Sequence, residues 1–210
     1  MTQIVFTPDL KTLTSDDKVV IPEELKVNWV DDINGKSALH VQPTKNEFCV
    51  EDEWIILFKD FEFSDGTIEF EALGQSNPPQ SNFLGIAFHV LNESTHDAVY
   101  FRPFNFNSDD PDRKSHAVQY ISHPNYRWFN LRQDFAGQYE KPIIPVPNGD
   151  DWFHTRIVVE QPMVSVFVNH AAEPSLIIFE LGNRLGNSIG IWCGPGQGGY
   201  FANLQITSGL

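Results

Sequence analysis

The sequence has few cysteines, and it lacks any long apolar run. Only Cys49 and Cys193 occur among the 210 residues, too few for a disulfide framework, and we expect two buried thiols. No run of 18 apolar residues occurs, so we expect no membrane-spanning helix. The first residues lack the basic start and apolar stretch of a secretory signal. We therefore expect a cytoplasmic protein, or a periplasmic or secreted one if a signal has been removed.

Basic residues are scarce relative to acidic ones. Lysine and arginine number 14 against 28 aspartates and glutamates, which gives a formal net charge of −14. Proteins hold nucleic acid mainly through lysine and arginine contacts to phosphates, so this charge excludes nucleic acid as an expected partner. The same repulsion disfavours polyanionic sugars. Neutral glycans carry no such charge penalty.

Helical periodicity is nearly absent, and one short helical turn within residues 126–140 is the only helix we expect. Short runs rich in Val, Ile and Phe recur instead, bounded by turn residues. These runs are 37–42, 47–51, 54–63, 67–73, 83–90, 97–102, 116–121, 153–159, 163–169, 175–180, 188–193 and 200–206. Strands at this spacing, in a chain with 17 Phe for a large core, predict an all-β sandwich or barrel.

Alternating segments such as IEFEA, GIAFHV and MVSVFVN indicate strands with one buried face and one wet face. This pattern favours two stacked antiparallel sheets over a parallel sheet covered by helices. We predict one domain over residues 1–210, an antiparallel two-sheet jelly-roll sandwich whose core runs from about residue 27 to about residue 207.

Residues 97–120 predict a hairpin with two different faces. Successive strand side chains point to opposite sides, which places Val99, Phe101, Val118 and Tyr120 on a core face. Tyr100, Arg102 and Gln119 share the other face with small alanines, which suits the floor of a wet groove. Their hydroxyl, guanidinium and amide groups match the hydroxyls of a sugar. The alternative is that Arg102 is structural and holds the turn at Pro103.

Two long connections, 103–115 and 122–151, have no sustained periodicity. Loops of that length in a compact domain are usually functional or disordered, and the aromatic content of the second argues against disorder. Trp128, Arg132 and Tyr139, followed by Glu140, are candidate ligand contacts on this loop. The aromatic residues could equally anchor the loop to the core.

Six segments follow one another between about residues 50 and 207. They read FSDGTIEFEA, FLGIAFHV, DAVYFRPFNF, HAVQYISHPNYRW, DWFHTRIVV with VSVFVN, and GNSIGIWCGPGQGGYFANLQI. This succession resembles a bacterial concanavalin A-like lectin/glucanase jelly roll, similar to its laminin G-like and 3-keto-disaccharide hydrolase-like domains. The resemblance implies the fold. It leaves the activity open, because that superfamily holds glycosidases, lyases, lectins and adhesion modules.

Glu69 and Glu71 share one face of the segment TIEFEA, about 6.5–7 Å apart by strand geometry. Glycosidases place two carboxylates about 5–10 Å apart, so the pair is a catalytic candidate. The laminarinase-type motif of the superfamily would place a third carboxylate at Leu73 or Gly74, so it is broken here. The alternative is two solvated glutamates. His89, expected on the groove face, is the candidate general base.

The sequence predicts no cofactor and no metal ligands. No two histidines have the spacing of a zinc motif. Asn107, Asp109, Asp110 and Asp112 carry hard oxygens of the kind that calcium prefers, but we expect a solvated charged loop there. A structural calcium held by backbone oxygens, as many members of the resembled superfamily have, would leave no trace in the sequence.

These observations favour recognition of a neutral carbohydrate, either by a glycan-binding module or by a glycoside-processing enzyme. One alternative is a non-catalytic module that buries a sheet face against a protein partner or in a homo-oligomer. Another is a polysaccharide lyase, which would need Gln, His, Arg and Tyr together in the groove.

Overall fold

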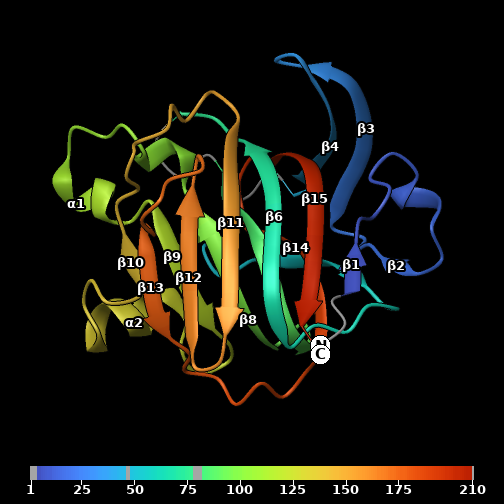
Figure 1. Cartoon of the computed structure of the whole chain (residues 1–210). Helices are drawn as coiled ribbons and strands as arrows, with labels where there is room; N and C mark the ends of the chain where they lie inside the picture. The colour runs from blue at the N-terminus through green and yellow to red at the C-terminus, as the bar shows by residue number, and fades with distance from the viewer. Residues whose placement is uncertain (1–3, 46–47, 78–81, 210) are drawn as a thin grey trace.

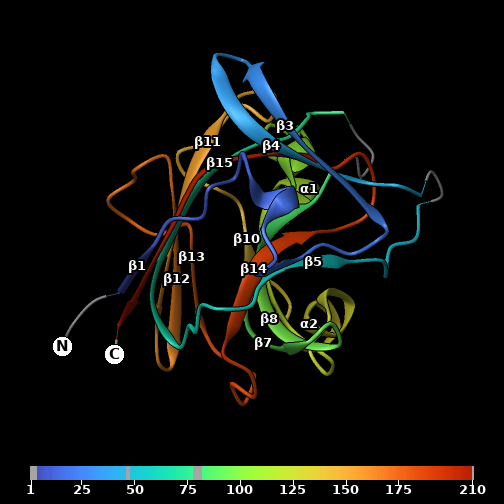
Figure 2. The same cartoon turned by 90° about the vertical axis from the view of Figure 1, so that its right-hand side faces the viewer.

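The computed structural model describes residues 4–45, 48–77 and 82–209, and folds them into two antiparallel sheets packed face to face. Figure 1 looks onto one sheet, and Figure 2 shows the two layers from the side. This arrangement confirms the predicted antiparallel two-sheet sandwich. None of the helices in the described ranges is long and apolar enough to cross a bilayer.

Sheet A contains eight strands, and all of its pairings are antiparallel. Its spatial order is β13 (Leu176–Phe179), β12 (Met163–Val168), β11 (Phe153–Glu160), β6 (Asp65–Leu73), β15 (Gly199–Gly209), β4 (Lys36–Pro43) and β3 (Leu25–Ile33), with β1 (Ile4–Phe6) also paired to β15.

Sheet B contains seven strands, again all antiparallel. Its order is β10 (Glu140–Lys141), β9 (Val118–Ser122), β8 (Thr95–Phe101), β7 (Leu84–Asn92), β14 (Ser188–Cys193), β5 (Trp54–Phe58) and β2 (Val19–Val20).

Within the described residues, four short helical elements lie in the connections. They are the 3₁₀ turns η1 (Leu13–Ser15) and η2 (Pro103–Asn105) and the helices α1 (Pro111–Ser115) and α2 (Trp128–Asp134). The predicted helical turn corresponds to α2. Helices α1 and α2 and strand β10 lie along one lateral edge of the sandwich, on the left in Figure 1. The two long connections thus fold over sheet B.

The core lies between the sheets and consists of alternate residues from both. Phe70 on β6 meets Phe101 on β8 with ring centroids 6.4 Å apart, and both are fully buried. Val99 and Tyr120 are also fully buried, as expected for the core face of the hairpin. Because strand side chains alternate, the opposite face of β8 and β9 is the outer face of sheet B.

The two cysteines differ in their surroundings, which corrects the expectation of two buried thiols. Cys193 on β14 is fully buried, and burial raises the pKa of its thiol to about 12. Cys49 is exposed, because the segment 48–51 forms no strand and does not reach the core.

Candidate binding pocket on sheet B

A row of cross-strand neighbouring residues on the outer face of sheet B forms the base of the site. Cross-strand pairing links Glu140 to Gln119, Gln119 to Tyr100, Tyr100 to Gly85, and Gly85 to Trp192. Because Gly85 has no side chain, the rings of Tyr100 and Trp192 stack across it, with centroids 4.6 Å apart and planes 25° apart. A Cβ at Gly85 would lie 2.7 Å from the Cβ of Tyr100. The glycine therefore permits the aromatic pair.

Arg102, directly after β8, lies against this row. Its Nη2 donates to the Tyr100 hydroxyl at 2.6 Å and to Gln119 Oε1 at 2.7 Å, and its Nη1 donates to the His116 carbonyl at 2.8 Å. Gln119 Oε1 also accepts from the Tyr100 hydroxyl at 3.2 Å. Burial lowers the pKa of Arg102, but arginine keeps its charge in proteins. The guanidinium is thus a fixed group of donors.

Glu140 connects α2 to the sheet. It is buried, and its carboxylate accepts from Nε and Nη2 of Arg132 at 2.9–3.0 Å. His116 Nδ1 lies 2.8 Å from Glu140 Oε2, and Arg102 Nη1 lies 4.0 Å from the same atom. The Arg132 guanidinium sits 4.9 Å from the ring centroid of Trp128. This ion pair therefore fixes both Arg132 and Trp128 above the sheet.

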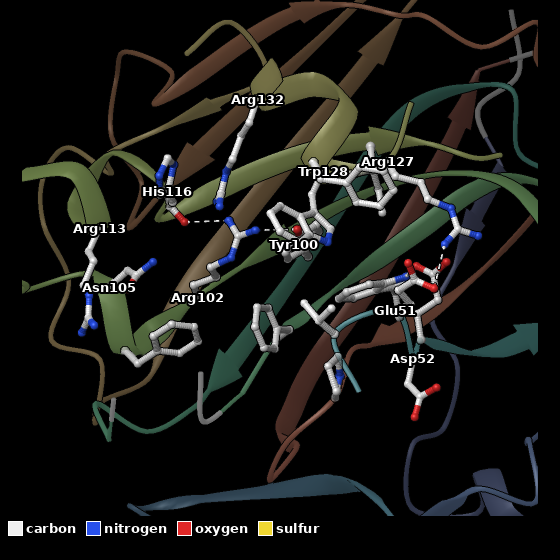
Figure 3. A pocket seen from close by; sticks show the side chains of 18 of the residues that line it. Glu51, Asp52, Tyr100, Arg102, Asn105, Arg113, His116, Arg127, Trp128 and Arg132 are labelled. Atoms are coloured by element: carbon white, nitrogen blue, oxygen red, sulfur yellow. Dashed lines mark hydrogen bonds and ion pairs between the residues drawn. The ribbon is translucent and has the colours of Figure 1, made fainter. Parts of the chain in front are cut away.

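These groups line a pocket of about 270 Å³. Figure 3 shows Arg102 between His116 and Tyr100, with Trp128 and Arg132 nearby from α2. The lining residues are Val50, Glu51, Asp52, Glu53, Phe83, Tyr100, Arg102, Phe104, Asn105, Asp112, Arg113, His116, Ile121, His123, Arg127, Trp128, Phe129, Arg132, Trp192 and Pro195.

Glu53 is an acid of the pocket wall whose pKa is strongly lowered. Its Oε1 lies 2.8 Å from His123 Nδ1, and its Oε2 accepts from Trp192 Nε1 at 3.0 Å. Burial alone would raise the pKa of Glu53, but the neighbouring imidazoles of His123 and His96 outweigh this effect and lower the pKa to about 2. Glu53 is therefore a fixed anion in the pocket wall.

The structure brings together most of the predicted binding residues. Tyr100, Arg102, Trp128 and Arg132 all line the pocket. Gln119 is fully buried behind Tyr100 and Arg102, where it orients both side chains and does not itself line the pocket.

Tyr139 does not line the pocket, contrary to its predicted role as a ligand contact. Its ring packs against Tyr120 and Phe135, with centroids 6.0 and 5.7 Å away. Only 8% of the residue is exposed. Tyr139 therefore anchors the loop to the core.

Glu69 and Glu71 lie on β6 in sheet A, whereas the pocket lies on sheet B, so the structure does not bring them to the site. Glu71 is ion-paired with Lys36 and accepts a hydrogen bond from Asn203. Glu69 Oε1 lies 3.5 Å from His154 Nε2. The alternation that suggested the pair is correct, but it places both side chains on the outer face of the other sheet.

His89 is not on the groove face, which corrects the prediction from strand alternation. A bulge interrupts the β7–β8 pairing after Phe88, and His89 has a positive φ of 50°. Its Nδ1 lies 2.9 Å from Asp97 Oδ2 and its Nε2 lies 2.8 Å from the Ser64 carbonyl oxygen. The bulge turns the imidazole away from the pocket into a buried ionic cluster.

The acidic loop caps a helix. Asp110 is the N-cap of α1, and its Oδ1 accepts from the backbone N–H of Asp112 at 2.9 Å. Asn107 Nδ2 donates to the Pro147 carbonyl. One of these hydrogen bonds lies within the loop and caps α1, and the other ties the loop to the second long connection.

Sequence reasoning missed several pocket residues. Glu53 lies in the segment before β5, His116 lies at the start of the second predicted strand of the hairpin, and Trp192 lies on β14, two strands away from β8. A glycine at position 85 between two aromatic strands was the signal that could have revealed the Tyr100–Trp192 stack. Reading it requires the order of β8, β7 and β14, which strand patterns alone do not give.

No family model matches the chain, and no curated protein matches it by sequence. Solved structures do match. The metal-free carbohydrate recognition domain of Emp46p gives a TM-score of 0.56 at 9% identity, covering 97% of this chain and 92% of that one. A Bacillus subtilis protein of unknown function with a galectin-like fold gives 0.53 at 11% identity, covering 87% and 86%. The Bacillus subtilis carbohydrate-binding module CBM66 gives 0.51 at 12% identity, covering 87% and 94%. At these identities the likeness establishes the jelly-roll fold.

Proposed function

We propose that the protein is a glycan-binding module that holds a neutral carbohydrate in the pocket on sheet B. The observation that carries this proposal is the stacked Tyr100–Trp192 pair beside the fixed guanidinium of Arg102, all three lining one concavity. A sugar offers an apolar ring face and a rim of hydroxyls. Small-molecule sites combine apolar walls with a few fixed polar groups in this way.

The size of the pocket favours a small ligand. Its volume of about 270 Å³ lies just below the usual range for small-molecule sites, about 300–1,000 Å³. Helix α2 and the segment before β5 close the pocket on two sides. The ligand is therefore a chain end or a short oligosaccharide, since a long polymer would have to lie across these segments.

The charges of the pocket favour a neutral ligand. Its cationic lining residues are Arg102, Arg113, Arg127 and Arg132, and its acidic ones are Glu51, Asp52, Glu53 and Asp112. Several of these are already paired, as Arg127 is with Glu51 at 4.0 Å. An anionic sugar would approach the ionised Glu53 and a protein of net charge −14.

Binding without cleavage fits the protonation of Glu53. A glycosidase needs a carboxylic acid that is protonated at its working pH. The pKa of about 2 keeps Glu53 ionised near neutral pH, so it accepts hydrogen bonds from hydroxyls and cannot supply the proton. Glu69 and Glu71 lie on the other sheet.

A glycan array of neutral oligosaccharides, followed by calorimetric titration of the hits, tests the proposal. A reducing-sugar assay run on the same hits separates binding from cleavage. We expect saturable binding of at least one neutral glycan with no product release. A folded protein that binds none of them would refute the proposal, and product release would show a glycosidase instead.

Two tryptophan variants locate the site. Trp128→Ala removes a half-buried ring from the pocket wall, and we expect an affinity loss of roughly tenfold, about 1.4 kcal/mol. Trp29→Ala is the matched control, because Trp29 is also half-buried but lies on β3 of sheet A. Equal losses in the two variants would place the binding elsewhere.

A further inference from the structure

Along β8 and β9, further residue pairs on the outer face of sheet B follow the pair Tyr100 and Gln119. The next pair is Ala98 and Ile121, and beyond it the backbone N–H of His123 donates to the His96 carbonyl at 2.8 Å. The rings of His96 and His123 lie side by side, with centroids 4.8 Å apart and planes 25° apart. The alternation of both strands thus places two imidazoles at one end of the pocket.

Glu53, immediately before β5, faces both imidazoles. Its Oε1 is 2.8 Å from His123 Nδ1, and its Oε2 is 3.8 Å from His96 Nε2. Trp192 Nε1 donates to the same Oε2 at 3.0 Å and orients the carboxylate. One potential ligand atom from each of the three residues lies within 4.8 Å of the others.

His96 is unusual because its imidazole is buried with no hydrogen bond to any described residue and only a longer ionic contact, 3.8 Å from Nε2 to Glu53 Oε2. The side chain has no exposed surface, and neither ring nitrogen has a hydrogen-bond partner among the residues that the structure describes. A buried polar group without a partner is costly, and such groups are uncommon in folded proteins. A ligand that bonds to Nε2 would remove this cost.

We propose that Glu53, His96 and His123 bind a divalent transition-metal ion of the zinc class at this end of the pocket. The ligands are a Glu53 carboxylate oxygen, His96 Nε2 and His123 Nδ1. Bonds of about 2.0–2.2 Å to one ion place ligand atoms about 3–4 Å apart, close to the spacings of 2.8 and 3.8 Å seen here. The 25° angle between the ring planes requires one imidazole to turn as the ion binds.

The ligand set selects the class of metal. Imidazole nitrogens suit zinc, copper, nickel and iron, whereas calcium and magnesium prefer sites made of oxygens alone. The hydrogen bond from Trp192 to the Glu53 carboxylate is the kind of outer contact that orients a metal ligand.

The ion would be accessible from the pocket. Glu53 and His123 both line it, while His96 lies beneath them. Three protein ligands leave a fourth position of a tetrahedral ion open for a water molecule or a ligand from the pocket. The ion-binding proposal does not depend on carbohydrate binding.

Equilibrium dialysis and calorimetry with Zn²⁺ test the site in the full chain, without an affinity tag and in a Cys49→Ser background. That background removes the exposed thiol as a competing ligand. We expect one bound Zn²⁺ per chain, a higher melting temperature with Zn²⁺, and no competition from excess Ca²⁺. Absence of Zn²⁺ binding would overturn the proposal.

Substitutions then identify the ligands. His96→Gln and His123→Gln should each weaken Zn²⁺ binding roughly tenfold or more, as should Glu53→Gln. Three variants guard against one failing to fold, and circular dichroism checks each. His154→Gln is the matched control, because His154 stacks on His170 at 3.9 Å near Glu69 on sheet A, where a surface ion could also bind.

The variants give separate outcomes for the two proposals. Zn²⁺ binding that is lost in His154→Gln and kept in His96→Gln would refute the site. The glycan titrations are repeated with Zn²⁺ and with a chelator. Glycan binding that is absent under both conditions refutes the proposed function and leaves the Zn²⁺ result intact.

Discussion

The Tyr100 hydroxyl accepts a hydrogen bond from Nη2 of Arg102 at 2.6 Å, and this contact defines the floor of the pocket. Tyr100 in turn donates to Gln119, which also accepts from Arg102. The three side chains form a closed ring of hydrogen bonds. Arg102 is therefore part of the scaffold as well as a candidate contact for the ligand.

Replacing Arg102 tests this double role. Arg102→Met removes a buried cation. It also removes the donor to the His116 carbonyl and one of the two donors to Gln119 Oε1. We expect a loss of about 2–4 kcal/mol in the free energy of unfolding, together with loss of glycan binding. Urea unfolding and calorimetry measure the two effects.

The matched control for that experiment is Tyr100→Phe. It removes one hydroxyl and keeps the ring stacked on Trp192, so we expect a stability loss of only about 1 kcal/mol. A stability change of less than about 0.5 kcal/mol in Arg102→Met would show that the hydrogen-bond ring adds little to folding.

The variant Gly85→Ala tests whether the Tyr100–Trp192 stack requires a residue without a side chain at position 85. Gly85→Ala would bring a Cβ to 2.2 Å from the Val99 carbonyl oxygen and 2.7 Å from the Tyr100 Cβ, so the strands or the ring must shift. We expect a destabilisation of about 1–3 kcal/mol and weaker glycan binding, measured by urea unfolding and titration. Gly137→Asn is the control, because nothing lies within 4 Å of its Cβ position and asparagine tolerates its φ of 66°. Equal effects in the two variants would contradict the steric argument.

The sequence predicted the sites that depend on regular alternation. Strands β8 and β9 pair without interruption from Asp97 to Phe101, so period two placed Tyr100, Arg102 and Gln119 on one face. The same rule fails at His89, because β7 carries one residue more than β14 between the pairs Ala87–Gly190 and Val90–Ser188, and this bulge interrupts the alternation. A bulge of this kind leaves no compositional mark in GIAFHV.

The first part of the chain was the least predictable. Strand β3 carries the polar residues Asp31 and Asp32 and has only one buried residue, Leu25, because it is an edge strand beside β4. Period-two patterning weakens where both faces of a strand meet water. The short strands β1, β2 and β10, which have two or three residues each, are stabilised by their neighbours and not by their own composition.

The pocket walls could not be predicted from the sequence for a related reason. The carboxylate of Glu53 contacts His123 and Trp192, which lie 70 and 139 positions away in the chain. Such a cluster appears only once the order of the strands is known. Glu140 reaches the site because it pairs with Gln119 of β9. Its own strand, β10, has only two residues, too few for a sequence pattern that would predict this pairing.

The two cysteines should react very differently. The exposed Cys49 should react with a thiol reagent in the native state, whereas the buried Cys193, with a pKa of about 12, should stay a protonated thiol. We expect one modified thiol per native chain and two after unfolding in urea, measured by mass spectrometry. Cys49→Ser should abolish labelling of the native protein. Rapid modification of Cys193 under native conditions would show that β14 opens readily.

The His154–His170 pair on sheet A predicts a pH dependence of stability. Burial, followed by the nearby His170, lowers the pKa of His154 below its usual 6.5. A lowered pKa means that the folded state prefers neutral His154. Its contribution is therefore fully present above pH 6.5 and is lost as the pH falls through the lower folded-state pKa. Urea midpoints measured between about pH 7.5 and pH 5 should fall less steeply for His154→Gln than for the parent protein. Identical slopes would show that His154 is equally easy to protonate in the folded and unfolded states.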